Sequence, residues 1–341
     1  MRRARDLGLA CGRGKPGALN SIGDVPGVTV GHATLADGAI QTGVTAIRPH
    51  SGNLYRDKVV AGSVVLNGYG KSVGLVQVAE LGTLETPILL TNTLSVGTCS
   101  TALIRRAIAE NPDIGRETAT VNSVVMECND GFLNDIQALK VSEADARAAL
   151  DTARADFSVG AIGAGRGMSC FGFKGGIGSS SRKLKLDGEK FHLGVLALCN
   201  FGRAGDLTLP DGLRVAPPSE AEADKGSVIL VMATDVPLDD RQIRRIIARA
   251  GVGLARVGSF WGHGSGDIAI GFTTANRVNH DEKSDLIPRR ILNESRIDRL
   301  FEAMADATQE SVLDALAAAD AVTGRDGNYR PALAAALGEK Q

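Results

Sequence analysis

The sequence predicts a mixed α/β fold in which helices cover both faces of one or two β-sheets. Short apolar runs rich in β-branched residues alternate with amphipathic helical stretches along the chain. Glycine accounts for 42 of 341 residues, a share of about 12% against the usual ~7%, which indicates many sharp turns and close backbone approaches. Hydrophobic residues at 43% and charged residues at 23% are typical of a globular chain that buries a sizeable core.

Eight segments are expected to form strands because they are short and apolar, with β-branched or alternating residues. They are residues 27–34, 43–48, 59–66, 87–90, 118–125, 191–199, 227–234 and 266–274. A strand-like run at 157–162 precedes a glycine-rich stretch at 163–178. The spacing of its glycines does not match a dinucleotide-binding fingerprint, so this stretch is interpreted as a tightly turned loop.

Four segments are expected to be helical. Residues 101–110 end at Asn111-Pro112, which terminates a helix. Residues 142–154 open with a capping box from Ser142 to Asp145. Residues 238–257 carry apolar side chains at 3.6-residue spacing, and a long helical stretch covers 295–319.

Composition excludes several functional classes. The formal charge of −1 gives no basic surplus for nucleic acid, and no apolar run approaches the ~18 residues that span a bilayer. The five cysteines are widely spaced without a CxxC pair, so neither a disulfide framework nor a zinc site is expected, and no cofactor is predicted. No signal peptide is evident at the amino end, so the cytoplasm is the expected compartment.

Residues 206–226 form a compositional boundary. The segment contains three prolines and several acidic residues, and it is expected to be an exposed linker. It leads through Gly226 directly into Ser227, the first residue of a buried-looking strand. An ordinary surface loop before a strand is the plainer alternative.

A second cluster of chemically capable residues lies in the segment HGSGD. If this segment is extended, Ser265 and Asp267 point to the same side because they are two residues apart. His263 is the only histidine beside such groups, and its participation stays open. Glycine, serine and aspartate also make ordinary turns.

Nine motifs in a fixed order extend over nearly the whole chain. They are 22–32 (IGDVPGVTVGH), 67–71 (NGYGK), 90–97 (LTNTLSVG), 127–131 (ECNDG), 172–178 (GFKGGIG), 199–200 (CN), 226–227 (GS), 233–237 (ATDVP) and 264–267 (GSGD). With them the sequence resembles the L-aminopeptidase/D-alanine esterase-amidase and β-peptidyl aminopeptidase family of self-processing serine peptidases. The resemblance implies one αββα sandwich domain over 1–341, similar in layers to the N-terminal nucleophile hydrolases but with different connectivity.

The resemblance also implies autocleavage between Gly226 and Ser227. Cleavage would give chains 1–226 and 227–341, the second with 341 − 226 = 115 residues. Ser227 would then be the nucleophile, and its new α-amine has a reference pKa of about 7.7–8.0, close enough to neutral to serve as a base.

Further site residues follow from the same resemblance. Ser265 and Asp267 would orient and polarise Ser227; some members have glutamate at the position of Asp267. Asn200 would supply the oxyanion-hole donor, and Glu127 would bind the ammonium group of the substrate. A salt bridge to an arginine is the alternative for Glu127. Some members place a tyrosine hydroxyl near this acid, whereas this chain has Cys128 and Asn129 there, so the second oxyanion donor stays open.

The implied activity is release of small N-terminal residues, including D-alanine or β-amino acids, from peptides, amides or esters, without a metal. The implied assembly is a homo-oligomer, a tetramer of αβ heterodimers. Two alternatives are an acyltransferase of the ornithine acetyltransferase type, which uses a threonine nucleophile, and a non-catalytic small-molecule binding protein with the same fold.

Overall fold

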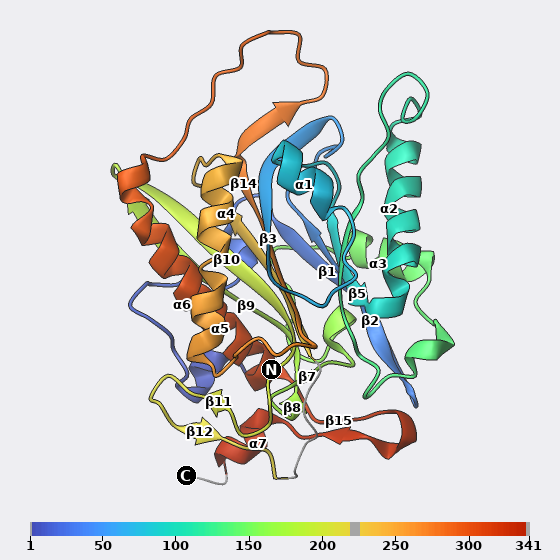
Figure 1. Ribbon diagram of the computed structural model, residues 1–341, viewed down its shortest axis with the longest axis vertical. Coiled ribbons are helices and arrows are strands. Elements are labelled where there is room, and N and C mark those ends of the chain that lie inside the picture. Colours follow the sequence, from blue (N-terminus) through green and yellow to red (C-terminus); the bar gives the residue numbers. More distant parts are fainter. Residues whose placement is uncertain (1, 219–225, 339–341) are drawn as a thin grey trace.

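Two β-sheets pack face to face between two layers of helices in the computed structural model, which describes residues 2–218 and 226–338 (Figure 1). The smaller sheet has the strand order β1 (Thr29–Asp37), β2 (Ile40–Arg48), β5 (Ile88–Asn92), β6 (Val124–Cys128). The larger sheet has the order β4 (Thr83–Leu84), β3 (Asp57–Gly68), β14 (Gly266–Asn279), β13 (Ser227–Thr234), β10 (Glu189–Asn200), β9 (Gly176–Leu186). The αββα sandwich is therefore confirmed.

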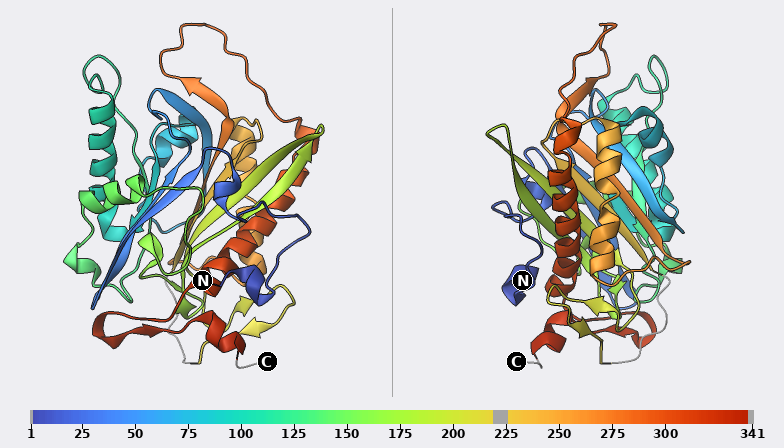
Figure 2. Two further views of the ribbon diagram at one scale, coloured as in Figure 1. Left: turned by 180° about the vertical axis from the view of Figure 1, so that it is seen from behind. Right: turned by 60° about the vertical axis from the view of Figure 1, so that its left-hand side comes forward.

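Helices cover the outer face of each sheet. The smaller sheet is covered by α2 (Val96–Glu110) and α3 (Glu143–Asp151). The larger sheet is covered by α4 (Asp240–Ile247), α5 (Ala250–Arg256) and α6 (Asp298–Ala318). In Figure 2, α2 and α3 lie on one side of the molecule and α6 on the other. Two short helices, α1 (Leu75–Leu81) and α7 (Leu333–Gly338), complete the set.

Three hydrophobic clusters correspond to the three interfaces of these layers. One lies between the sheets and includes Met126 of β6 and Ile229 of β13. A second joins the larger sheet to α4, α5 and α6, and a third joins the smaller sheet to α2 and α3. Strands β13 and β14 are buried on both faces over residues 227–234 and 266–273, as continuous apolar runs predict.

The predicted helix over 238–257 is two helices. The chain tightens at residues 248–249, where the amide of Arg249 donates to the carbonyl of Ile246, and α5 begins at Ala250. Glycines in α5 allow close packing: a Cβ at Gly253 would lie 2.6 Å from the carbonyl oxygen of Ala305 in α6. The other three predicted helices are confirmed with shifted ends, and Ser142 does form the capping box with Asp145.

The structure differs from the predicted strands in three places. Residues 157–162 form only an isolated bridge between Gly160 and Ile177. Strand β9, which starts within the expected glycine loop and continues to Leu186, was not predicted. The strand expected at 118–125 is displaced toward the carboxyl end, since β6 covers Val124–Cys128. The remainder of the glycine loop forms a 3-10 turn and the hairpin of β7 (Ser169–Cys170) with β8 (Phe173–Lys174).

The segment 206–218 is not exposed throughout, contrary to the prediction of a linker. It contains the hairpin of β11 (Leu207–Thr208) and β12 (Arg214–Val215), and the side chains of Leu207, Leu209 and Val215 are buried against the core of the larger sheet. Alternate apolar residues in a short hairpin account for this burial. The rest of the predicted linker, 219–225, lies outside the described residues.

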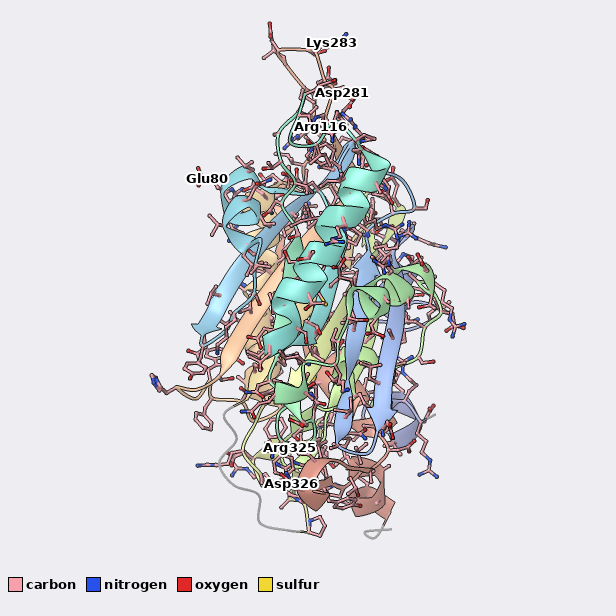
Figure 3. All side chains as sticks on the ribbon, turned by 90° about the vertical axis from the view of Figure 1, so that its right-hand side faces the viewer. Glu80, Arg116, Asp281, Lys283, Arg325 and Asp326 are labelled. Carbon is pink, nitrogen blue, oxygen red and sulfur yellow. The ribbon has the colours of Figure 1, made fainter. Side chains whose placement is uncertain are left out.

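The long axis of the sandwich has two distinct ends. A projecting loop that includes Asp281 and Lys283 lies at one end, and Arg325 and Asp326 lie at the other (Figure 3). The second end also holds β7, β8 and the hairpin of β15 (Val322–Thr323) with β16 (Tyr329–Arg330) (Figure 1). None of the described helices has the length and apolar character needed to span a bilayer.

Candidate active site

Ser227 is the first residue of β13, at the centre of the larger sheet. It lies opposite Asn200 of β10 on one side and Gly266 of β14 on the other, and only 5% of its surface is exposed. The preceding Gly226 is closely packed, since a Cβ there would lie 2.3 Å from the carbonyl oxygen of Asn200. Glycine is therefore required at 226 by crowding, and its φ is not in the left-handed region.

Ser265 and Asp267 are brought together as the spacing predicts. The hydroxyl of Ser265 donates to Oδ1 of Asp267 at 2.8 Å, and both side chains are buried. Asn67 on the adjacent strand β3 holds this turn by donating from Nδ2 to the carbonyl of Ser265 at 2.8 Å. The pair lies beside Ser227, because Ser265 immediately precedes β14, Asp267 lies in it, and Ser227 pairs with the intervening Gly266.

The carboxyl group of Asp267 is poorly solvated. Burial raises its pKa to about 6, while hydrogen bonds from Ser265 and Asn67 act in the opposite direction. Its second oxygen, Oδ2, has no hydrogen bond meeting normal geometry among the described residues. A carboxyl group with this pKa is half ionised at about pH 6 and mostly ionised at pH 7, where it can accept the hydrogen bond from Ser265.

The side-chain amide of Asn200 is fixed in one orientation. Its Oδ1 accepts from the backbone N–H of Ser169 at 2.9 Å, and its Nδ2 donates to the carbonyl of Asn129 at 2.8 Å. An amide nitrogen has two N–H donors, so one is available beyond the bond to Asn129. Asn200 is opposite Ser227 in the β10–β13 pairing, which places this donor beside the serine.

Glu127 lies on β6, in the other sheet. Its oxygens accept from the backbone N–H of Lys71 at 2.8 Å and from the hydroxyl of Thr93. The side chain is 3% exposed, and it forms no ion pair within the described part of the chain. The alternative of a salt bridge to an arginine is therefore wrong for this structure. The sequence did not indicate Lys71 or Thr93 as partners of Glu127, although they lie in the family motifs at 67–71 and 90–97.

Cys128 connects the two sheets at this point. Its thiol is fully buried, and burial raises its pKa well above the usual range, while a hydrogen bond with the Ser227 hydroxyl lowers it. Cys128 thus contacts the predicted nucleophile from the opposite sheet.

The side chains of His263 and Asn129 form no hydrogen bond with the predicted catalytic residues among those described. His263 is exposed and has no side-chain hydrogen bond to any described residue. The side chain of Asn129 accepts from the backbone N–H of Gly131.

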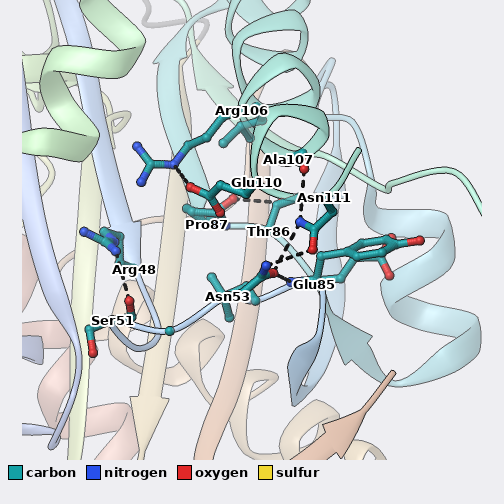
Figure 4. Close-up of a pocket in the computed structure, with 14 residues that line it drawn as sticks. Arg48, Ser51, Asn53, Glu85, Thr86, Pro87, Arg106, Ala107, Glu110 and Asn111 are labelled. Carbon is teal, nitrogen blue, oxygen red and sulfur yellow. Dashed lines mark hydrogen bonds and ion pairs between the residues drawn. The ribbon is translucent and has the colours of Figure 1, made fainter. Parts of the chain in front are cut away.

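A separate pocket lies at the other end of the smaller sheet (Figure 4). Its walls include Arg48, Glu85, Arg106 and Asn111, and none of the predicted site residues lines it. It opens beside Pro87, where β5 begins, whereas Glu127 lies near the end of β5 and β6. Within residues 2–218 and 226–338, no group of three His, Cys, Asp or Glu side chains is arranged so that it could hold a metal ion.

The fold and the buried serine that starts its central strand define a hydrolase of the N-terminal nucleophile class. The family model for peptidase family S58 matches residues 20–330. Two curated relatives are β-peptidyl aminopeptidases BapA. That of Sphingosinicella microcystinivorans is 37% identical over 95% of this chain and 88% of its own, and that of Sphingosinicella xenopeptidilytica is 35% identical over 94% and 86%. The chain belongs to peptidase family S58 and is a hydrolase.

Solved structures agree with this assignment. A Pyrococcus horikoshii protein matches with a TM-score of 0.93 and 48% identity over 97% of this chain and 96% of its own. A Burkholderia β-aminopeptidase matches with a TM-score of 0.90 and 39% identity over 99% and 98%. The L-aminopeptidase D-Ala-esterase/amidase of Ochrobactrum anthropi, described as a variant of the Ntn hydrolase fold, matches with a TM-score of 0.90 and 34% identity over 100% and 99%.

Proposed function

We propose that this peptidase is a self-cleaving serine aminopeptidase that releases small N-terminal residues from peptides, amides or esters through an acyl-Ser227 intermediate. The observation that carries the proposal is the meeting of Ser227, the Ser265–Asp267 pair, Asn200 and Glu127 at one end of the two sheets. The substrate class, including β-amino and D-alanyl residues, is supported by the names of the relatives.

Cleavage between Gly226 and Ser227 would create the base as well as the nucleophile. A serine hydroxyl is weakly nucleophilic until a neighbouring group takes its proton. The α-amine freed on Ser227 has a reference pKa of about 7.7–8.0, so a useful fraction is neutral near pH 7.5. The chain would then consist of residues 1–226 and 227–341.

The surrounding groups have complementary roles in this mechanism. The hydroxyl of Ser265, polarised by Asp267, orients the amine and hydroxyl of Ser227. The available N–H of Asn200 faces the oxyanion, and a donor of this kind stabilises the transition state by about 2.7–4 kcal/mol. Because Ser169 and Asn129 hold the amide in place, little reorganisation is needed during the reaction.

Glu127 accounts for selectivity toward a free amino terminus. A buried carboxylate without a cation is unfavourable, and the ammonium group of a substrate would supply that cation. An N-acylated substrate brings no charge and would leave the carboxylate unpaired. The absence of an ion pair to Glu127 among the described residues supports this role.

The test is the change Glu127→Gln, assayed with an aminoacyl p-nitroanilide and its N-acetyl derivative. We expect kcat/KM for the free amine to fall by about 100-fold, and the weak hydrolysis of the acetylated compound to change far less. Glu85→Gln, which alters another buried glutamate far from the site, should leave both rates near the wild-type values. Equal losses for both substrates would refute the anchoring role.

We further propose that the enzyme works as a homo-oligomer in the cytoplasm, with a tetramer of αβ pairs as the expected assembly. Apolar side chains are exposed on the surface, and Val76 and Leu286 are each 87% exposed. The five cysteines are free, buried thiols, which suits a reducing compartment. Light scattering of the purified protein tests the assembly: a monomeric mass at micromolar concentration would contradict it.

A further inference from the structure

We propose that the ammonium group of Lys174 polarises the oxyanion donor Asn200 through the peptide group that joins Met168 to Ser169. Lys174 would then be a positioning residue for acyl transfer, acting from the far end of a chain of hydrogen bonds. Two of these bonds are present in the structure, and the third is the one that Asn200 gives to the oxyanion. The inference rests on the proposed function, because it concerns the same oxyanion at Ser227.

A two-residue hairpin brings Lys174 next to Ser169. Strands β7 and β8 are antiparallel, and Ser169 lies opposite Lys174. Phe171 and Gly172 form the loop between them with φ of 52° and 80°, and a type I′ turn requires positive φ at both positions. The loop is attached to the end of β10, because the amide of Phe171 donates to the carbonyl of Phe201 at 2.9 Å. The hairpin is therefore a fixed part of the oxyanion side of the site.

The two hydrogen bonds of this relay share one peptide group. The ammonium group of Lys174 donates to the carbonyl of Met168 at 2.6 Å. The N–H of Ser169 belongs to the same peptide group and donates to Oδ1 of Asn200 at 2.9 Å. A donor on an amide oxygen strengthens the N–H of that amide, so successive bonds polarise one another. The positive charge of Lys174 therefore strengthens the second N–H of Asn200, which lies beside Ser227.

The hydrogen bonds of Lys174 require its charged form. Its Nζ donates to three carbonyls, those of Gly165, Met168 and Gly175, at 2.9, 2.6 and 2.8 Å. An ammonium group has three N–H donors, whereas a neutral amine has two. Lys174 is also the one lysine that is fully buried among the described residues, so water does not screen its charge.

The charge of Lys174 is not paired with a carboxylate. Lys174 forms no ion pair with any residue of 2–218 or 226–338. Burial lowers its pKa well below the usual value and Arg166 acts in the same direction, whereas Cys170 and Asp130 raise it. A buried charge without a counter-ion is unfavourable. The negative charge that develops on the oxyanion during acyl transfer would offset part of that cost.

The experiment measures kcat and KM for β-alanyl p-nitroanilide in Lys174→Gln and Lys174→Met, per cleaved chain as counted by intact mass. Glutamine keeps N–H donors without the charge, and methionine keeps only the volume. We expect kcat to fall by about tenfold in both variants. KM should stay within about twofold, because Glu127 on the other sheet binds the substrate amine. An unchanged kcat per cleaved chain would overturn the proposal, since Lys174 would then only stabilise the fold.

Asn200→Ala tests whether the effect passes through Asn200. This variant alone should lose about 10²–10³-fold in kcat. Adding Lys174→Gln should cost less than about twofold more, because the relay then has no donor at its end. A further tenfold loss in the double variant would overturn the proposal, since Lys174 would then act by another route.

Arg166→Met is the matched control. Arg166 is a partly buried cation two residues before Met168, and its Nε donates to Oε1 of Gln41 at 2.6 Å, outside the relay. Its loss should leave kcat within about twofold of wild type. A loss as large as that of Lys174→Gln would contradict the relay, because any nearby positive charge would then serve.

The wild-type enzyme provides a test even if the Lys174 variants do not fold. NMR of ¹⁵N-labelled protein should show Lys174 as an ammonium group at the assay pH. Raising the pH until Lys174 loses its proton should shift the signals of the Ser169 N–H and the Asn200 side-chain amide together. A neutral amine at the assay pH, or signals that do not respond, would overturn the proposal. Failure of the wild type on aminoacyl p-nitroanilides would instead reject the proposed function itself.

Discussion

The proposed role of Asp267 requires an ionised carboxylate at a buried position where ionisation lowers the stability of the fold. Burial raises the pKa of this carboxyl group to about 6, above its ordinary value near 4. A group with a raised folded-state pKa costs stability when it is ionised, so the cost is present above pH 6 and is relieved as the pH falls toward 4. In the proposed mechanism the ionised form is the one that accepts the hydrogen bond from Ser265.

Asp267→Asn should therefore slow turnover but not weaken the fold. We expect kcat/KM to fall by about 100-fold, because a neutral amide polarises the Ser265 hydroxyl less than a carboxylate does. The rise in wild-type activity near pH 6 should disappear from the pH–rate profile. Urea denaturation at pH 8 should give the variant an unfolding free energy equal to or above that of wild type. A variant with an unchanged rise near pH 6 would contradict this account.

For individual residues, the sequence indicates which side chains belong to the candidate site better than it indicates which residues they contact. The pairing of Ser265 with Asp267 follows from two-residue spacing in an extended segment, and the structure confirms it. By contrast, the contacts of Glu127 with Thr93 and of Asn200 with Ser169 join residues more than 30 positions apart. No local pattern indicates such contacts, because the packing of the two sheets creates them.

Strand β13 is the element that positions the nucleophile, and its start depends on Gly226. Gly226→Ala would place a methyl group 2.3 Å from the carbonyl oxygen of Asn200 and 2.5 Å from the Cα atom of Phe201. The end of β10 would have to shift, which would move Asn200. We expect cleavage of the precursor to slow by at least about tenfold, as followed on denaturing gels over time.

Gly97→Ala is the control for that change. Gly97 lies in α2, where a Cβ would have no heavy atom within 4 Å, and alanine favours a helix by about 1 kcal/mol. Its cleavage should match that of wild type. Equal cleavage in the Gly226 variant would show that the crowding does not matter.

The predicted elements match the structure best where a strand is apolar along its whole length. The run 227–234 is apolar throughout most of its length and matches β13 residue for residue. Strand β9 was missed because both of its faces are buried around serines 179, 180 and 181, which bond to neighbouring backbone and side chains rather than filling a hydrophobic core. The break between α4 and α5 was missed because apolar periodicity continues across it.

At the scale of the whole molecule, the amino-terminal segment is fixed to α6 by buried charges. Glu310 of α6 is fully buried and accepts from Arg5, Arg182 and Asn20. Burial alone would raise the pKa of Glu310, but the arginines outweigh it and hold the pKa below its usual value. The resulting stability is present above pH 4–5 and is lost as the pH falls through the lowered pKa.

Glu310→Gln should destabilise the fold by about 3–5 kcal/mol, because Arg182 would remain buried without its counter-charge. Urea denaturation at pH 7 measures the loss. Glu294→Gln removes the exposed partner of Arg241, and it should cost no more than about 1 kcal/mol. Similar losses in the two variants would contradict the assignment of a buried network.

The central claim is that the bond between Gly226 and Ser227 breaks to form the active enzyme, and the most direct measurement is intact mass with N-terminal sequencing of purified protein. Wild type should give two chains, one of 115 residues starting at Ser227, and Ser227→Ala should give a single chain of 341 residues. An active wild-type protein with this bond intact, or two chains from Ser227→Ala, would contradict the account.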